Sequence, residues 1–156
     1  FLERPLSAED IQAGFDLVEW KGRFERIAAA PDVIYDVAHN FDSIHTFRKT
    51  VEEVYPEKNV RIVLGLLHDK APEKVLMELE LFADDIWISP VNSHRSMSME
   101  ELKDLASRFP RVTLADSIQE ACRDAYDNIN DKSILCIIGS HYIAEDVYSC
   151  IKSKDL

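Results

Sequence analysis

The residues best suited to chemistry follow directly after short apolar runs rather than lying inside them. Acidic, basic, imidazole and hydroxyl side chains gather in four segments, at 36–40, 65–70, 89–95 and 139–141. These segments hold four of the five histidines and two of the four glycines, so the polar groups are concentrated there. An anionic ligand would need cations close by, and Arg23, Lys70 and Arg95 are the basic residues placed to provide them. The pattern predicts a functional site at these segments, although no reaction follows from it alone.

Strands must position these segments. β-Branched and apolar runs predict strands at 33–35, 60–64, 86–88, 112–114 and 134–138. The last run is apolar throughout, as expected of a central strand buried on both faces. Residues 24–27 are a weaker candidate for an edge strand. In a parallel sheet ligands bind beyond the carboxyl ends of the strands, which is where the polar segments would lie.

Helical periodicity alternates with these strands. Apolar residues recur at helical spacing over 44–55, 75–82, 102–109, 118–126 and 143–151. Ser98–Glu101 and Ser117–Glu120 have the sequence of capping boxes, and Pro72 suits a first helical turn. The alternation predicts an α/β, Rossmann-like three-layer domain, with a mainly parallel sheet of about six strands and helices on both faces. We expect a single domain over 1–156, in which residues 1–17 form a lead-in segment.

Composition excludes several classes of function. The net charge of −11 argues against binding nucleic acid, which calls for a basic face. No apolar run reaches the roughly 18 residues that a membrane span needs. The three cysteines, Cys122, Cys136 and Cys150, lack the spacing of metal ligands and are expected to be reduced core thiols of a cytoplasmic protein.

Simpler interpretations stand beside the functional ones. Asp36 and Asn40 could cap a helix that starts near residue 41, and Lys70 could pair with Asp69 at the surface. Gly139–Ser140 could be only a tight turn. The sequence has no Walker loop, no dinucleotide fingerprint, no nucleophile elbow and no zinc-spaced cluster. The domain is therefore expected to hold only half of an active site.

A set of motifs occurs here in the order found in one family. They are Trp20–Glu25 (WKGRFE), Asp36–Asn40 (DVAHN), Gly65 with Asp69–Lys70, Arg95 before a capped helix, and Gly139–Ser140. From about residue 15 to 151 the chain resembles the C-terminal domain of folylpolyglutamate synthases and dihydrofolate synthases, relatives of the Mur peptide ligases.

The resemblance implies an ATP-dependent ligase that joins L-glutamate to a folate or dihydropteroate carboxylate through an acyl phosphate. Members of the family carry the Walker loop and the Mg²⁺ ligands on a larger N-terminal P-loop domain. The chain would then be a fragment of a longer two-domain enzyme, inactive alone, with ATP, Mg²⁺, L-glutamate and a folate as its cofactors and substrates.

Residue roles carried over from the resemblance begin with the nucleotide. Arg23 would contact the ATP phosphates, and Asp36 would hold the ribose hydroxyls, with Asn40 beside it on the nucleotide side. His39 would lie near the γ-phosphate and the incoming glutamate. The resemblance therefore implies catalytic roles for His39 and Arg23.

The amino-acid side rests on two other residues. Lys70 and Ser140 resemble the residues that hold the carboxylates of glutamate. Arg95 matches a family arginine to which no role is assigned, and none is assigned to His141. No metal ligand is expected within this domain.

Two alternatives remain at this stage. One is a Mur-type ligase of cell-wall synthesis, although such domains often have Asp-Tyr-Ala-His where this chain has Asp-Val-Ala-His. The other is a receiver-like signalling module, which would need an acidic pair after its first strand, whereas only Asp36 follows the first core strand here.

Overall fold

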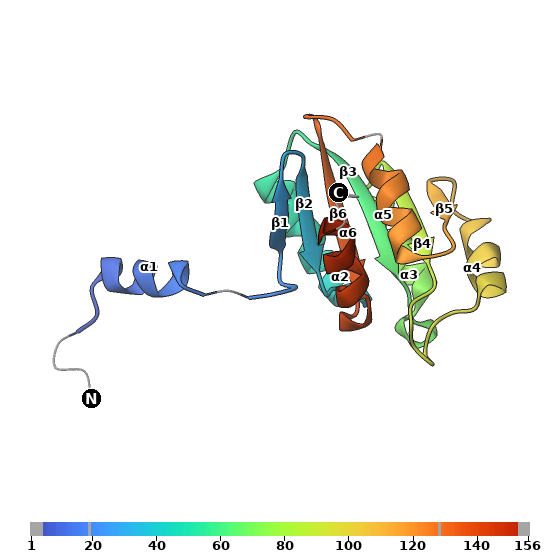
Figure 1. Cartoon of the computed structure of the whole chain (residues 1–156), viewed down its shortest axis with the longest axis horizontal. Coiled ribbons are helices and arrows are strands. Elements are labelled where there is room, and N and C mark those ends of the chain that lie inside the picture. The colour runs from blue at the N-terminus through green and yellow to red at the C-terminus, as the bar shows by residue number, and fades with distance from the viewer. Residues whose placement is uncertain (1–4, 19, 128, 153–156) are drawn as a thin grey trace.

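The computed structural model of the chain describes residues 5–18, 20–127 and 129–152. Within these residues one six-stranded sheet forms the centre of the fold (Figure 1). Its strands are β1 (Glu25–Ala29), β2 (Asp32–Asp36), β3 (Asn59–Gly65), β4 (Asp85–Ser89), β5 (Val112–Leu114) and β6 (Ser133–Gly139). The order across the sheet is β1-β2-β6-β3-β4-β5, and only β1 runs antiparallel to its neighbour. The predicted α/β architecture, with a weak strand at one edge, is confirmed.

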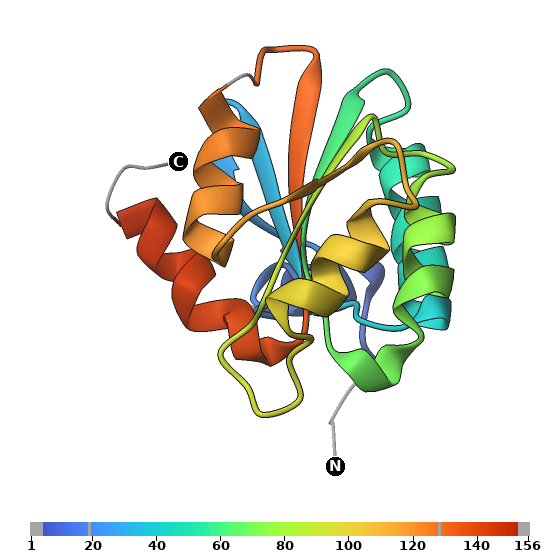
Figure 2. The same ribbon diagram turned by 90° about the vertical axis from the view of Figure 1, so that its right-hand side faces the viewer.

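Helices cover both faces of this sheet (Figure 2). The helices on the sheet are α2 (Phe41–Val54), α3 (Pro72–Leu79), α4 (Met99–Ala106), α5 (Ile118–Asp127) and α6 (Ala144–Lys152), with short 3-10 turns η1 (His68–Lys70) and η2 (His141–Ile143). A further helix, α1 (Ala8–Asp16), precedes the sheet in the chain. α2, α3 and α4 contribute to the apolar core on one face, and α5 and α6 to the core on the other. No helix among the described residues is long and apolar enough to cross a membrane.

β6 lies in the middle of the fold because its side chains are apolar on both faces. All seven of its residues are buried. Ile134, Cys136 and Ile138 enter the core under α2 and α3, whereas Leu135 and Ile137 enter the core under α5 and α6. The uninterrupted apolar run that predicted a central strand thus serves two cores at once.

Helix starts follow the sequence signals closely, with one exception. The capping box at Ser98 and Glu101 is complete, and Pro72 occupies the first turn of α3. The second predicted box forms only half of its bonds. Ser117 Oγ accepts a hydrogen bond from the Glu120 amide at 3.1 Å, but the Glu120 carboxylate accepts from the Asp116 amide at 2.6 Å. That carboxylate reaches one residue further back than a capping box requires.

The predicted helix in the lead-in segment is present as α1, which starts at Ser7 with a complete capping box. α1 stands clear of the sheet in Figure 1, and none of its residues is buried. Residues 1–4 of the predicted lead-in lie outside the described residues, as does the side chain of Ile151, which was expected on the apolar face of α6.

Strand register brings the polar segments to one edge. Asp36 at the end of β2 is paired with Ile138 of β6, and Gly65 at the end of β3 is paired with both Gly139 and Ser89. The carboxyl ends of four neighbouring strands therefore finish side by side. As predicted, the segments that follow them share this edge of the sheet.

Candidate functional site

Asp36 closes one corner of this edge by binding two backbone amides. Its Oδ2 accepts a hydrogen bond from the Phe24 N–H at 2.7 Å, and its Oδ1 accepts one from the Ala38 N–H at 2.7 Å. The first bond joins residues twelve positions apart and ties the loop before β1 to the end of β2. The interpretation of Asp36 as a cap of α2 is wrong, since the carboxylate binds upstream of that helix, where Asn40 is the cap.

The loop that carries Arg23 has an unusual backbone. Gly22 has φ of +68°, and a Cβ there would lie 2.8 Å from Val37 Cγ1, so a larger residue would collide with the chain just after β2. Phe24 also has a positive φ, of 46°, which is uncommon for a residue with a side chain. The Asp36 carboxylate holds the Phe24 amide in that conformation, so Arg23 is presented between two constrained residues.

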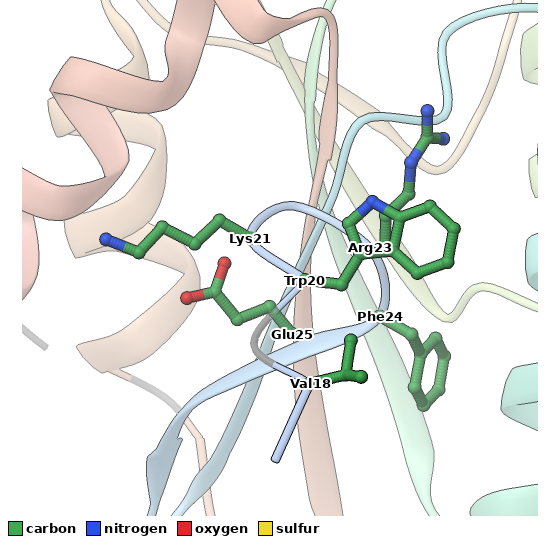
Figure 3. A pocket seen from close by; sticks show the side chains of 6 residues that line it. All are labelled: Val18, Trp20, Lys21, Arg23, Phe24 and Glu25. Carbon is green, nitrogen blue, oxygen red and sulfur yellow. The ribbon is translucent and has the colours of Figure 1, made fainter. Parts of the chain in front are cut away.

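Arg23 and Asp36 line the same hollow. Its volume is about 290 Å³, and its remaining walls are Phe24 of the loop and Ser43, Thr46, Phe47 and Thr50 of α2. Arg23 also borders a second hollow of about 320 Å³, which Figure 3 shows from close by. That hollow is lined by Val18, Trp20, Lys21, Phe24 and Glu25 as well. The structure therefore brings together Arg23 and Asp36, two of the three residues expected to hold a nucleotide, and leaves Arg23 exposed.

Glu25 links this loop to α6 through hydrogen bonds that the sequence did not predict. Its Oε2 accepts hydrogen bonds from the Gly22 N–H and from the Tyr148 hydroxyl, both at 2.7 Å. Tyr148 packs edge-on against Tyr35, whose buried hydroxyl has no hydrogen-bond partner among the described residues. Burial raises the pKa of Tyr35 to about 12, and the nearby carboxylates of Glu25 and Asp36 add to that shift. Because Glu25 and Tyr148 are 123 positions apart, no local sequence signal announces their contact.

His39 has a defined orientation. Its Nδ1 lies 2.8 Å from the carbonyl oxygen of Val37. Because a carbonyl only accepts, Nδ1 carries the hydrogen and the lone pair of a neutral ring lies on Nε2. The amides of His39 and Asn40 both donate to Ser43 Oγ at 3.1 Å, which fixes the start of α2. This corner can present one imidazole nitrogen as a proton acceptor or, when protonated, as a donor.

Asn40 has the simpler of its two predicted roles. Its Oδ1 accepts a hydrogen bond from the Ser43 N–H at 3.0 Å and thereby caps α2. This use of Oδ1 leaves the side-chain NH₂ group as the donor that could meet a ligand. The alternative prediction of a helix cap is confirmed for Asn40.

A second corner forms where the loops after β3 and β4 meet. Asp69 in η1 binds Arg95 through a hydrogen-bonded ion pair, and Lys70 Nζ lies 3.8 Å from the same Asp69 oxygen. The hydrogen bond from Arg95 lowers the pKa of Asp69, and the pKa of Arg95 is raised in return. Tyr142 of η2 also raises the pKa of Arg95. Arg95 thus joins the segments that follow β3 and β4, which is a structural role that the sequence did not reveal.

The backbone reinforces this corner. The amide N–H of His68 donates to the Arg95 carbonyl oxygen at 3.1 Å, and His68 Nδ1 lies 2.9 Å from the same oxygen. Leu67 and Ser96 form an isolated antiparallel bridge beside it. The predicted pairing of Lys70 with Asp69 is present, but Arg95 is the closer partner of Asp69.

Ser140 follows Gly139, whose backbone lies close to that of Gly65 on the neighbouring strand β3. Gly139 has φ of +145°, and a Cβ on it would lie 2.9 Å from the Gly65 carbonyl oxygen. A Cβ on Gly65 would in turn lie 2.6 Å from Val91 Cγ1 and 2.7 Å from Ile143 Cγ2. The Ser140 carbonyl accepts from the Ile143 N–H at 3.1 Å, whereas its hydroxyl makes no capping bond to η2. The predicted tight turn is confirmed, and the hydroxyl is left for another use.

The edge thus consists of two separately built corners, one around Arg23, Asp36 and His39 and one around Lys70 with its neighbours. Among the described residues no hydrogen bond or ion pair joins the two corners. His141 is exposed in η2 and belongs to neither set of contacts. No group of three or more histidine, cysteine, aspartate or glutamate residues in the described chain is placed to hold a metal ion.

Residues 22–141 match the sequence family described as the Mur ligase, glutamate ligase domain. The chain belongs to this family. The match spans both corners of the carboxyl edge, from Gly22 beside Arg23 to His141 beside Ser140. Membership of a ligase family decides against the receiver-like signalling module that was kept as an alternative.

Individual relatives and solved structures show which members of the family this chain is similar to. A dihydrofolate synthase/folylpolyglutamate synthase of Mycobacterium tuberculosis is 30% identical over 132 residues, which are 83% of this chain and 27% of the relative. A crystal structure of the bifunctional folylpolyglutamate synthase/dihydrofolate synthase of Yersinia pestis, complexed with AMPPNP and a Mn ion, has a TM-score of 0.82 and 26% identity. The structural alignment covers 96% of this chain and 36% of the Yersinia pestis chain.

Another crystal structure of a bifunctional folylpolyglutamate synthase/dihydrofolate synthase has Mn, AMPPNP and L-glutamate bound. It has a TM-score of 0.79 and 27% identity, and the alignment covers 96% of this chain and 36% of the chain in that structure. This chain spans about a third or less of the length of the curated relatives that it matches. The similarity therefore concerns one part of those enzymes.

Proposed function

We propose that this chain is the C-terminal domain of an ATP-dependent ligase that adds L-glutamate to a folate or dihydropteroate carboxylate. The observation that carries the proposal is the juxtaposition of Arg23 and Asp36 at the carboxyl edge of a sheet that belongs to the glutamate ligase family. The names of the relatives favour a folate enzyme over a cell-wall ligase. The three thiols, all buried and none in a disulfide, fit a cytoplasmic location.

The nucleotide is assigned to the first corner. The guanidinium of Arg23 provides a fork of donors for phosphate oxygens, which suits it to ATP. The Asp36 carboxylate already accepts two backbone hydrogen bonds, and its remaining lone pairs would accept the ribose hydroxyls. The free NH₂ group of Asn40 would complete the nucleotide side.

Glutamate is assigned to the second corner. Lys70 would hold one of its carboxylates as a point charge, and Ser140 would donate a hydrogen bond from its hydroxyl. The Asp69 carboxylate pairs closely with Arg95 and only at 3.8 Å with Lys70. Lys70 is therefore the cation of this corner that is less engaged by Asp69. The spacing of the corners along one edge would place glutamate beside the transferred phosphate.

The reaction proceeds in two displacements in this proposal. An oxygen of the folate carboxylate attacks the γ-phosphorus of ATP, the bond to the β,γ-bridging oxygen breaks, and ADP leaves. The amine of glutamate, after losing a proton, attacks the acyl carbon, the amide bond forms, and phosphate leaves. His39 lies on the loop that would face the γ-phosphate and the amine, and its Nε2 is the ring nitrogen that would act there. Catalysis rests on positioning and charge stabilisation rather than on a covalent bond to the enzyme.

The rest of the site is assigned to an N-terminal P-loop domain of the same protein. That domain would contribute the phosphate-binding loop and the ligands of Mg²⁺, because the described residues contain neither a Walker sequence nor a metal-binding cluster. When bound, Mg²⁺ supplies charge neutralisation of the phosphate oxygens. The 156-residue chain alone would then bind ATP weakly and have no ligase activity.

The proposal is tested with the full-length enzyme, radiolabelled glutamate, ATP, Mg²⁺ and either dihydropteroate or a reduced folate. We expect a product longer by one glutamate together with ADP and phosphate. His39→Ala should lower turnover strongly with the melting temperature nearly unchanged, and His141→Ala is the matched control that should leave both as they are. The proposal fails if the folded full-length enzyme incorporates no glutamate, or if the 156-residue chain alone sustains the reaction.

A further inference from the structure

The loop that presents Arg23 is held by hydrogen bonds to its backbone on both sides of that residue. The Gly22 N–H donates to Glu25 Oε2 at 2.7 Å, and the Gly22 carbonyl oxygen accepts from the Val37 N–H at 2.9 Å. The amide that follows Arg23 in the chain donates to Asp36 at 2.7 Å. The peptide groups before and after Arg23 are therefore fixed before any ligand arrives.

Glu25 acts on this loop from the side opposite to the Arg23 guanidinium. The two residues border the same hollow, but Figure 3 shows their charged ends pointing away from each other. Among the described residues the half-buried Glu25 carboxylate forms no ion pair, so it serves as a hydrogen-bond acceptor. Its negative charge would repel the phosphate oxygens of a nucleotide, so its use lies in the loop geometry that it imposes.

The carboxylate of Glu25 is itself oriented by α6. The Tyr148 hydroxyl donates to the same oxygen, Oε2, at 2.7 Å, and the Tyr148 ring stands edge-on against the buried ring of Tyr35, with 5.8 Å between the ring centroids. Burial and the hydrogen bond to Glu25 raise the pKa of Tyr148, so its hydroxyl keeps the proton that it donates. Two hydrogen bonds in series thus run from α6 through Glu25 to the Gly22 amide next to Arg23.

We propose that Glu25 and Tyr148 are positioning residues for the phosphate transfer, because they set the backbone from which Arg23 reaches the nucleotide. The inference rests on the proposed function for the identity of that ligand. The effect of both residues passes through Arg23 rather than through a contact of their own with the phosphates. A misplacement of about 1 Å can cost on the order of 100-fold in rate, so this support matters for the reaction.

Both hydrogen bonds end on one oxygen, and this determines the choice of variants. An amide oxygen has two lone pairs, so Glu25→Gln can accept both bonds, whereas Glu25→Ala accepts neither. Tyr148→Phe removes only the support from α6. Tyr126→Phe is the matched control, because Tyr126 packs half-buried against the same apolar core and its hydroxyl makes no hydrogen bond among the described residues.

Steady-state kinetics of the full-length enzyme, with ATP and glutamate titrated separately, test the inference. We expect Glu25→Ala to lower kcat/KM for ATP at least about tenfold and Tyr148→Phe at least about threefold, with the KM for glutamate changed less than about twofold. Glu25→Gln should restore kcat/KM for ATP to within about threefold of the parent enzyme, and Tyr126→Phe should leave it unchanged. Added to Arg23→Ala, Glu25→Ala should cost less than about twofold more, because both changes remove the same contribution.

Melting temperatures separate positioning from a merely structural role. A structural role lowers the melting temperature of Glu25→Ala but leaves the ATP parameters of the folded enzyme unchanged, and that result would overturn the inference. An equal loss from Glu25→Ala in the presence and in the absence of Arg23 would also overturn it. Tyr148→Phe keeps the carboxylate and decides the question if Glu25→Ala does not fold.

Binding of AMPPNP with Mg²⁺, measured by calorimetry, separates the inference from the proposed function. If the enzyme makes no folate product but Glu25→Ala weakens AMPPNP binding as Arg23→Ala does, and Glu25→Gln restores it, the positioning role stands and the proposed function fails. If the enzyme is active and Glu25→Ala changes neither AMPPNP binding nor the ATP parameters, the proposed function stands and the positioning role fails. An enzyme that neither turns over nor binds AMPPNP would overturn both.

Discussion

Replacement of Asp36 should destabilise the domain before any ligand is considered. The carboxylate accepts hydrogen bonds from the Phe24 and Ala38 amides, both at 2.7 Å, and one of these bonds holds Phe24 at φ of 46°. Asp36→Ala removes both acceptors and releases the loop that presents Arg23. A loss of nucleotide affinity in this variant would therefore have a structural cause as well as a direct one.

The size of the effect follows from the two bonds. A hydrogen bond to a charged group contributes about 1.5–3 kcal/mol, and the half-buried position of Asp36 favours the lower part of that range. We expect Asp36→Ala to lower the free energy of unfolding by about 2–4 kcal/mol. Asp36→Asn should cost about 2 kcal/mol, because one amide keeps an acceptor while the other faces an NH₂ group. For a domain of this size, Asp36→Ala then melts roughly 5–15 °C lower.

Urea unfolding of the 156-residue chain, followed by circular dichroism, measures these changes. Asp104→Asn serves as the control, because the exposed Asp104 carboxylate pairs, among the described residues, only with Arg108 one helical turn away at 3.5 Å. This substitution should change stability by less than about 0.5 kcal/mol. If Asp36→Ala and Asp104→Asn unfold at the same urea concentration, the carboxylate does not hold the loop. The structural account of the first corner would then be wrong.

Three further predictions concern the strands and the second corner. Gly139→Ala should lower the free energy of unfolding by about 2–4 kcal/mol in urea, because its Cβ meets the Gly65 carbonyl at φ of +145°; an unchanged midpoint would contradict this. Burial raises the pKa of Tyr35 to about 12, so the stability that its neutral form contributes is complete below its ordinary pKa and is lost as pH rises from about 10 to about 12. Absorbance at alkaline pH should show Tyr35, together with Tyr55 and Tyr148, whose pKa values are also raised, ionising above pH 10 or on unfolding. Ionisation of every tyrosine near pH 10 in the folded protein would refute this prediction. Asp69→Asn should raise the KM for glutamate more than the KM for ATP in the full-length enzyme, since Arg95 and Lys70 lose their common partner; equal changes would argue against a role for that corner in glutamate binding.

The sequence predicted the architecture well because its signals there are local. The apolar run at 134–138 is typical of a strand buried on both faces, and Ser98 with Glu101 could start a helix without help from distant residues. The parallel sheet then placed Asp36 and Lys70 at the same edge, as expected. Periodicity and capping carry this information within a few residues of each position.

The details of the site could not be predicted because they depend on distant contacts. The bond between Asp36 and the Phe24 amide needs a left-handed backbone at a residue other than glycine, which no propensity predicts. Arg95 binds Asp69 across 26 positions, and Tyr148 binds Glu25 across 123. Each pairing joins residues of common types. The sequence around each of them is equally compatible with an exposed, solvated side chain. Only the folded chain shows that they meet.

The central claim is that one edge of the sheet holds ATP at Arg23 and glutamate at Lys70. The most direct measurement titrates ATP and glutamate separately in the full-length enzyme with Arg23→Ala and with Lys70→Ala. The account predicts that Lys70→Ala raises the KM for glutamate about tenfold or more with little change for ATP, since a charge-assisted hydrogen bond of about 1.5–3 kcal/mol is lost. Arg23→Ala should instead lower kcat and raise the KM for ATP, with little change for glutamate. If both variants leave both substrate dependences unchanged, or shift them alike, the assignment of the two corners is contradicted.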